Sequence, residues 1–175
     1  MTTTFDTVFA NVVGLEGGYT DATRDRGNWT GGAVGQGKLR GTKYGISAAA
    51  FPTLDIENLT LDTAKAIYRA NYWDKISGDE MPGPIAQVVF DCAVNQGTEA
   101  AAEILQYALR IDADGIIGPQ TIAAAQQHSS DPSGIVIEIG AQRAYRYALS
   151  QGVQDYGLGW MRRVFQVTTK ALAAA

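Results

Sequence analysis

The chain has 175 residues, of which 46% are hydrophobic and 18% charged, so it can bury a core as one domain. It contains one Cys and one His. These counts exclude an internal disulfide framework and a zinc cluster of Cys and His ligands, and they leave His128 as the only imidazole base. Acid–base chemistry therefore rests mainly on the 18 carboxylates.

The net charge of −4 is unevenly distributed along the chain. Residues 1–139 hold 9 basic and 17 acidic residues, whereas residues 140–175 hold 5 basic residues and 1 acidic residue. An acidic balance is not typical of nucleic-acid binding, so we expect no nucleic-acid partner. We interpret the basic segment around Trp160, Arg162, Arg163 and Lys170 as a solvated helix face, with contact to an anionic outer-membrane surface as the alternative.

The sequence shows no segment for membrane insertion or secretion. It has no run of about 18 apolar residues that would span a membrane. Its first residues lack the basic region of a signal peptide and include Asp6. We therefore expect synthesis in the cytoplasm without a signal peptide.

The N-terminal part alternates between one helix and an irregular segment. Apolar residues at helical spacing predict a helix over residues 5–15, which Gly17 and Gly18 would end. Residues 19–46 are rich in glycine and predict turns with short strands.

From residue 60 onward the pattern is helical. Thr60 is a plausible N-cap, and Pro119 suits the first position of a later short helix. The other helices are predicted over 85–96, 98–109, 134–150 and 158–173. Asp91 and Asn95 share one face of the 85–96 helix with Gln87, while Cys92 lies on its apolar face. The fold class predicted is mainly α (α+β), with a small irregular Gly-rich or β-containing segment near the N-terminus.

Glu16 is the strongest candidate for acid catalysis. It lies at the end of the predicted first helix, where the negative end of the helix dipole and partial burial both favour the protonated carboxyl group. A carboxylic acid that stays protonated near neutral pH is what a general acid requires.

Several stretches taken together resemble a known enzyme family. Glu16-Gly17-Gly18-Tyr19 is followed by Asp25 and then by Thr42-Lys43-Tyr44-Gly45-Ile46. This order is similar to that of the phage-type muramidases of glycoside hydrolase family 108. The second half resembles the companion region described as peptidoglycan-binding, through Tyr72-Trp73-Asp74, Val89 to Gly97 and Asp114 to Thr121.

The resemblance implies roles for individual residues. Glu16 takes the role of general acid, and Asp25 and Thr42 lie across the cleft from it. Thr42 follows Asp25 by 17 residues because of an insertion-like segment at 28–41, so Asp21 is a rival for the second carboxylate. The substrate contacts we expect are Tyr19, Trp29, Tyr44, Asp91 and Asn95. No metal and no cofactor is implied.

The resemblance also implies a domain organisation. We expect a single lysozyme-like domain over residues 1–175. Residues 1–58 would form the catalytic segment with Glu16, and residues 59–175 a helical, peptidoglycan-binding-like region packed with it. We expect a monomer.

The function implied is that of an endolysin with muramidase activity, which hydrolyses the β-1,4 bond between N-acetylmuramic acid and N-acetylglucosamine. Its partner is the peptidoglycan glycan strand, which it would reach after a holin opens the membrane. Two alternatives stay open: a lytic transglycosylase that forms 1,6-anhydro products, and a non-catalytic peptidoglycan-binding protein. The choice between inversion and retention depends on the separation of the two carboxylates.

Overall fold

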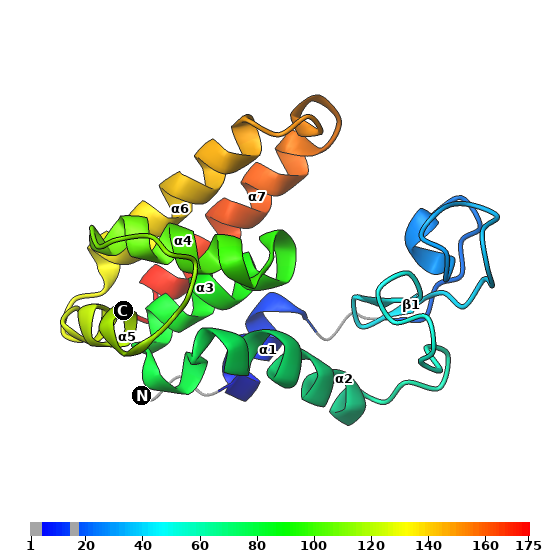
Figure 1. Ribbon diagram of the computed structural model, residues 1–175, viewed down its shortest axis with the longest axis horizontal. Coiled ribbons are helices and arrows are strands. Elements are labelled where there is room, and N and C mark those ends of the chain that lie inside the picture. Colours follow the sequence, from blue (N-terminus) through cyan, green and yellow to red (C-terminus); the bar gives the residue numbers. More distant parts are fainter. Residues whose placement is uncertain (1–4, 15–17) are drawn as a thin grey trace. The chain divides into compact units, whose positions relative to one another are not determined.

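The structure is a computed structural model that describes residues 5–14 and 18–175 (Figure 1). It divides into two compact units. The small unit comprises residues 9–68, and the helical unit comprises residues 69–175 together with the described residues of 1–8. The described elements are mostly helices with one two-stranded sheet, which confirms the predicted mainly α (α+β) fold class. The single integrated domain, divided at residues 58 and 59, stays a prediction.

Helix α1 (Phe5–Val12) is shorter than the helix predicted over residues 5–15. It ends at Val12, two residues before Gly14, which has a φ of 76°. Glycine reaches this left-handed conformation without the steric cost of a Cβ atom, and a residue of this kind commonly ends a helix. The predicted C-terminal boundary at residue 15 was therefore wrong.

The small unit contains the only sheet among the described residues. Strands β1 (Thr42–Lys43) and β2 (Ile46–Ser47) pair antiparallel, with Lys43 opposite Ile46. The two residues between them, Tyr44 and Gly45, have φ values of 51° and 73°. Positive φ at both central positions is the requirement of a type I′ hairpin turn. The turns and short strands predicted for the Gly-rich segment are thus confirmed.

Gly45 is required by packing as well as by the turn. A Cβ atom at this position would lie 2.5 Å from the Tyr68 hydroxyl oxygen. That hydroxyl donates a hydrogen bond to the Tyr44 carbonyl oxygen at 3.1 Å, and the Tyr68 ring packs edge-on against Phe9. Tyr68 ends helix α2 (Leu61–Tyr68), whose N-terminus is capped by the Thr60 hydroxyl as predicted.

The helical unit begins with three short helical turns and continues with five α-helices. The turns are η2 (Arg69–Trp73), η3 (Asp74–Ile76) and η4 (Gly78–Glu80). The helices are α3 (Gly83–Gln96), α4 (Thr98–Leu109), α5 (Pro119–Gln126), α6 (Ser133–Ala148) and α7 (Val153–Leu172). Helix α3 packs against α4, α6 and α7 and is buried from Pro84 to Ala93, so it forms the centre of the unit (Figure 1).

One fully buried carboxylate connects three of these helices. Asp91 on α3 is 0% exposed and accepts hydrogen bonds from Arg143 on α6 at 2.5 Å and from the Arg163 Nε atom on α7 at 2.8 Å. Burial alone would lower the pKa of the Arg143 guanidinium, but the charge and hydrogen bond of Asp91, together with Cys92 and Tyr147, outweigh it and raise the pKa above its ordinary value. The buried Arg143 guanidinium is therefore charged.

A buried amide organises the loop between α4 and α5. The Gln106 Nε2 atom donates to the Asp114 carboxylate at 2.7 Å and to the Ile116 carbonyl at 3.0 Å, and the Gly115 N–H donates to the Gln106 Oε1 atom. The bond from Gln106, together with that from the Ile116 N–H, lowers the pKa of Asp114. The Asp-Gly stretch is a turn, as predicted, with Gly115 at a φ of 74°.

Cys92 is buried on α3, as its place on the apolar face predicts. Burial raises the pKa of its thiol to about 11, and the protonated Sγ atom donates to Gln96 at 3.1 Å. The thiol is therefore a small, unreactive part of the core at neutral pH. Among the described helices none is both long enough and apolar enough to cross a membrane.

We predict that Asp91→Asn destabilises the protein by about 3–5 kcal/mol, because it leaves the Arg143 guanidinium buried without its counter-charge. Urea unfolding followed by circular dichroism measures this change. Asp112→Asn, at an exposed loop carboxylate, is the matched control and should change the free energy of unfolding by less than about 0.5 kcal/mol. Equal stability of both variants would contradict the prediction.

Candidate functional site

Glu16 lies outside the described residues, so its predicted place and role stay predictions. The other predicted site residues are all described. Tyr19, Asp25, Trp29, Thr42 and Tyr44 belong to the small unit, whereas Asp91 and Asn95 belong to the helical unit.

The insertion-like segment at 28–41 is a closed loop. The Thr30 N–H donates to the Lys38 carbonyl at 2.9 Å, and Trp29 forms an antiparallel bridge with Leu39. At the base, the Asn28 carbonyl accepts from the N–H groups of both residues 40 and 41, at 2.9 and 3.1 Å. The insertion therefore returns the chain to the point where it began, and Thr42 follows directly.

Asn28 is the centre of the site in the small unit. Its side chain is 0% exposed, and its Nδ2 atom donates to the Ala22 carbonyl at 3.0 Å. This bond orients the amide, so that Oδ1 accepts a hydrogen bond from the Thr42 hydroxyl at 2.7 Å. The Thr42 hydroxyl proton is thereby committed to Asn28, and the lone pairs of Oγ1 remain as acceptors.

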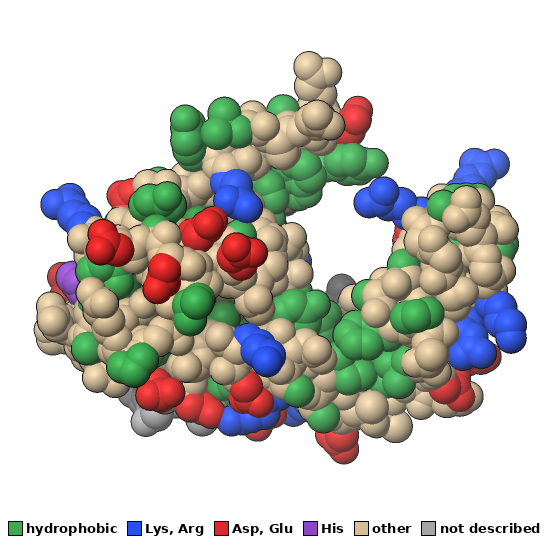
Figure 2. Space-filling model, in the orientation of Figure 1, with side chains coloured by type: hydrophobic (Ala, Val, Ile, Leu, Met, Phe, Trp, Pro, Cys, Tyr) green, Lys and Arg blue, Asp and Glu red, His purple; other side chains and the backbone are tan. Residues whose placement is uncertain are grey.

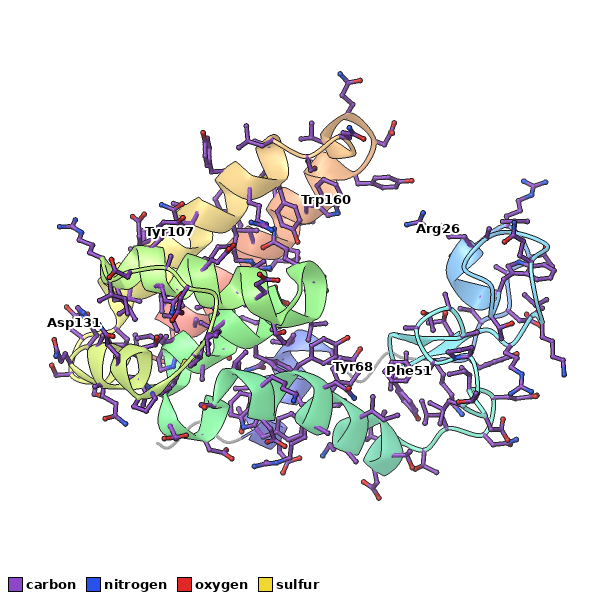
Figure 3. The ribbon with its side chains drawn as sticks, viewed as in Figure 1. Arg26, Phe51, Tyr68, Tyr107, Asp131 and Trp160 are labelled. Atoms are coloured by element: carbon purple, nitrogen blue, oxygen red, sulfur yellow. The ribbon has the colours of Figure 1, made fainter. Side chains whose placement is uncertain are left out.

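Asp25 is also hydrogen-bonded to Asn28, and these two residues with Thr42 are here named the Asn28 cluster. Asp25 is the N-cap of η1 (Arg26–Asn28), which Figure 3 marks at Arg26, and its Oδ1 atom accepts from the Gly27 N–H at 2.8 Å. Its backbone carbonyl accepts from the Asn28 N–H at 3.2 Å. Asp25 and Thr42 are therefore both hydrogen-bonded to Asn28, although 17 positions separate them in the sequence.

The sequence interpretation missed Asn28. Its sequence signal is weak, because one Asn in a Gly-rich segment is most simply a turn residue. Its importance depends on Ala22 and Thr42, which reach it only when the loop closes. A tertiary hydrogen bond of this kind leaves no spacing in the sequence that could reveal it.

Tyr19 lines a polar recess of about 410 Å³ in the small unit. Partial burial raises the pKa of its phenol, and the carboxylates of Asp21, Glu57 and Asp55 raise it further. The phenol therefore stays protonated at neutral pH and can donate a hydrogen bond. The recess also contains Arg40, so a ligand there would meet a cation, carboxylates and a phenol together.

Tyr44 and Trp29 are both held by their surroundings. Tyr44 adopts a left-handed backbone conformation at the hairpin tip, with the Lys43 ammonium 5.7 Å from its ring centre. For a bulky residue this conformation costs on the order of 1–3 kcal/mol, and such strain is typical of functional sites. Trp29 is half-buried, and its indole N–H donates to the Thr23 carbonyl at 2.9 Å.

The two predicted contacts in the helical unit differ in accessibility. Asp91 is occupied by Arg143 and Arg163, so a substrate could reach its carboxylate only by breaking these ion pairs. Asn95 is exposed one turn further along α3, and its Nδ2 atom donates to the Asp91 carbonyl at 2.7 Å. Both substrate contacts stay predictions.

Within residues 5–14 and 18–175, no group of three or more His, Cys, Asp or Glu side chains is placed to hold a metal ion.

Comparison with known proteins places this site in a family. The family model described as "Glycosyl hydrolase 108" matches residues 9–97, and the model described as "Predicted Peptidoglycan domain" matches residues 100–165. The solved structure of Brucella abortus SagA is 30% identical to the chain, with a TM-score of 0.78, and the match covers 97% of this chain and 94% of that one. A search of curated proteins returns no match.

We predict that Thr42→Val destabilises the protein by about 1–3 kcal/mol, because it leaves the buried Asn28 Oδ1 atom without its donor. Thr42→Ser keeps the hydroxyl and should retain most of the stability. Urea denaturation of the two variants beside the wild type measures the difference. If Val and Ser cost the same, the hydroxyl bond to Asn28 does not stabilise the site.

Proposed function

The chain belongs to the glycosyl hydrolase 108 family, and on this basis we propose that it is a muramidase. The two family matches make it a glycoside hydrolase that acts on peptidoglycan. We propose that the bond it hydrolyses is the β-1,4 bond between N-acetylmuramic acid and N-acetylglucosamine. The observation that carries it is the family match over residues 9–97, which includes Glu16, Asp25 and Thr42.

In the proposed mechanism, Glu16 protonates the leaving glycosidic oxygen. Cleavage passes through an oxocarbenium-like transition state, which a nearby carboxylate stabilises. Asp25 is the carboxylate we propose for this role, because it is exposed and belongs to the Asn28 cluster. The separation of the two carboxyl groups would determine whether the anomeric configuration is inverted or retained.

Thr42 supports hydrolysis in preference to water-free cleavage. Because its hydroxyl proton is donated to Asn28, the Oγ1 atom can only accept further hydrogen bonds. An acceptor beside the reacting sugar can bind and orient a water molecule, which a hydrolase needs and a lytic transglycosylase does not. We therefore assign Thr42 the role of holding the attacking water.

The products of the reaction test this choice. We predict that the wild-type protein releases muropeptides with reducing N-acetylmuramic acid ends, each carrying the mass of one added water. Mass spectrometry of digested peptidoglycan distinguishes them from 1,6-anhydro ends. Release of anhydro products would overturn the hydrolase proposal in favour of a lytic transglycosylase.

We predict that Glu16→Gln lowers the rate of peptidoglycan hydrolysis by about 10²–10⁴-fold, because the amide cannot donate the proton. Loss of turbidity of outer-membrane-permeabilised Gram-negative cells measures the rate. Glu80→Gln, the same substitution at an exposed residue of η4, is the control and should lyse at the wild-type rate. Equal lysis by wild type and Glu16→Gln would remove Glu16 from the mechanism.

We further propose that this activity serves host-cell lysis, as in an endolysin. In this proposal the protein is made in the cytoplasm and reaches the wall when a holin opens the membrane. The buried, protonated Cys92 supports it, because a fold that needs no disulfide forms in a reducing compartment. Contact of α7 with an anionic outer membrane would rest on Arg162, since Arg163 is paired with the buried Asp91.

A further inference from the structure

Two recesses on the helical unit meet at one ion pair. The first, of about 310 Å³, lies between α4 and α6. Its lining residues are Glu103, Ile104, Tyr107, Gln142, Tyr145, Arg146 and Leu149. The second, of about 440 Å³, surrounds the start of α4 from Gln96 to Ala100. Glu103 and Arg146 line both, so the two recesses form one track, here named the α4–α6 groove.

The spacing of the lining residues makes the groove continuous. On each helix they recur every three or four positions, which places them along one face. They are Glu99, Glu103 and Tyr107 on α4, and Gln142, Arg146 and Leu149 on α6. From Thr98, the first residue of α4, to Tyr107 the helix rises roughly 14 Å at 1.5 Å per residue. The groove is therefore long enough for an extended chain of more than one sugar.

The end of the groove toward Tyr107 presents aromatic rings to solvent. Tyr107, labelled in Figure 3, is 59% exposed and Tyr145 is 64% exposed, and Leu149 lies beside them. Large apolar side chains gathered at one exposed recess are typical of binding sites. A tyrosine ring offers a flat face to the C–H side of a pyranose ring and a hydroxyl to its polar groups.

The middle of the groove presents an ion pair that is loosely held. The Arg146 Nη1 and Glu103 Oε2 atoms are 3.6 Å apart, with side chains 52% and 36% exposed. Exposed pairs of this kind contribute little stability. Arg146 can therefore exchange Glu103 for a carboxylate of a ligand, to which a guanidinium can donate two parallel hydrogen bonds. Figure 2 shows basic, acidic and hydrophobic side chains interspersed on the visible face of this unit.

We propose that the α4–α6 groove is an anchoring site for peptidoglycan, with sugar rings on Tyr107 and Tyr145 and a stem-peptide carboxylate at Arg146. The inference rests on the proposed function. Both tyrosines and Arg146 lie within residues 100–165, which match the Predicted Peptidoglycan domain. Peptidoglycan combines pyranose rings with peptides that carry free carboxylates, and the groove offers a partner for each. Anchoring raises the effective concentration of the wall at the enzyme.

Binding is tested in the full-length chain carrying Glu16→Gln, so that the wall is not digested. The paired change Tyr107→Ala with Tyr145→Ala should weaken the affinity for purified sacculi, measured by co-sedimentation, on the order of ten-fold or more. The paired change to Phe keeps both rings and should retain binding. Tyr156→Ala, at a 63% exposed tyrosine of α7 outside the groove, is the matched control. Wild-type binding by the paired Ala variant overturns the proposal.

A second arm separates anchoring from catalysis. In the active enzyme, the paired Ala change should raise KM for sacculi and leave the rate on a short soluble glycan of alternating N-acetylmuramic acid and N-acetylglucosamine unchanged. Equal loss on both substrates overturns the proposal. Failure of the proposed function can be distinguished from failure of the groove. If the chain binds sacculi through the two tyrosines but cleaves no glycosidic bond, the groove proposal stands and the muramidase proposal is overturned.

A third arm tests the carboxylate at Arg146. Arg146→Ala should weaken binding to intact sacculi and leave binding to peptide-free glycan strands unchanged. Equal loss on the two ligands would overturn the assignment of Arg146 to the stem peptide.

Discussion

The helical unit depends on one buried charge. Asp91 is fully buried at the centre of α3, and its two oxygens bind arginines from α6 and α7. An ion pair in this position is costly to desolvate, but once formed it cannot lose a partner without leaving a charge in the core. The register of the three helices follows from it, because a shift of either partner helix would withdraw its guanidinium. The groove on α4 and α6 is held in shape by this same packing, since Arg143 and Arg146 lie one turn apart on α6.

The small unit uses a neutral group for the same purpose. Asn28 is as deeply buried as Asp91, and it joins a loop carbonyl, a helical turn and the β1 strand through hydrogen bonds. A neutral amide avoids the larger cost of burying a charge and provides both a donor and an acceptor. Of the two groups with predicted chemical roles, the half-buried Thr42 hydroxyl is placed by the Asn28 side chain. The exposed Asp25 carboxylate is placed by the Gly27 N–H, next to the backbone hydrogen bond between Asn28 and Asp25. The site therefore has a rigid base although most of its chain is loop.

The elements that could be predicted from the sequence are those that local patterns specify. Thr60 as a helix cap, Pro119 as a helix start and the turn at Asp114 and Gly115 are set by neighbours within a few positions. Gly14 shows the limit of this reasoning, since the helix ends two residues before it and not at the paired glycines that follow. The burial of Cys92 followed from helical periodicity. The ion pairs of Asp91 did not, because a carboxylate on the polar stripe of a helix is usually solvated.

By itself, the sequence determined the fold class and the family, and it supplied the candidate residues for the proposed chemistry, whose roles stay predictions. These depend on periodicity and on the order of short motifs, which are properties of the chain read in one dimension. The tertiary structure alone decided which distant residues meet: Asn28 with Thr42, Asp91 with Arg143 and Arg163, and Glu103 with Arg146. The physical reason is that a buried polar group must find its partner wherever the chain brings one. That choice depends on packing between elements, which no local spacing records.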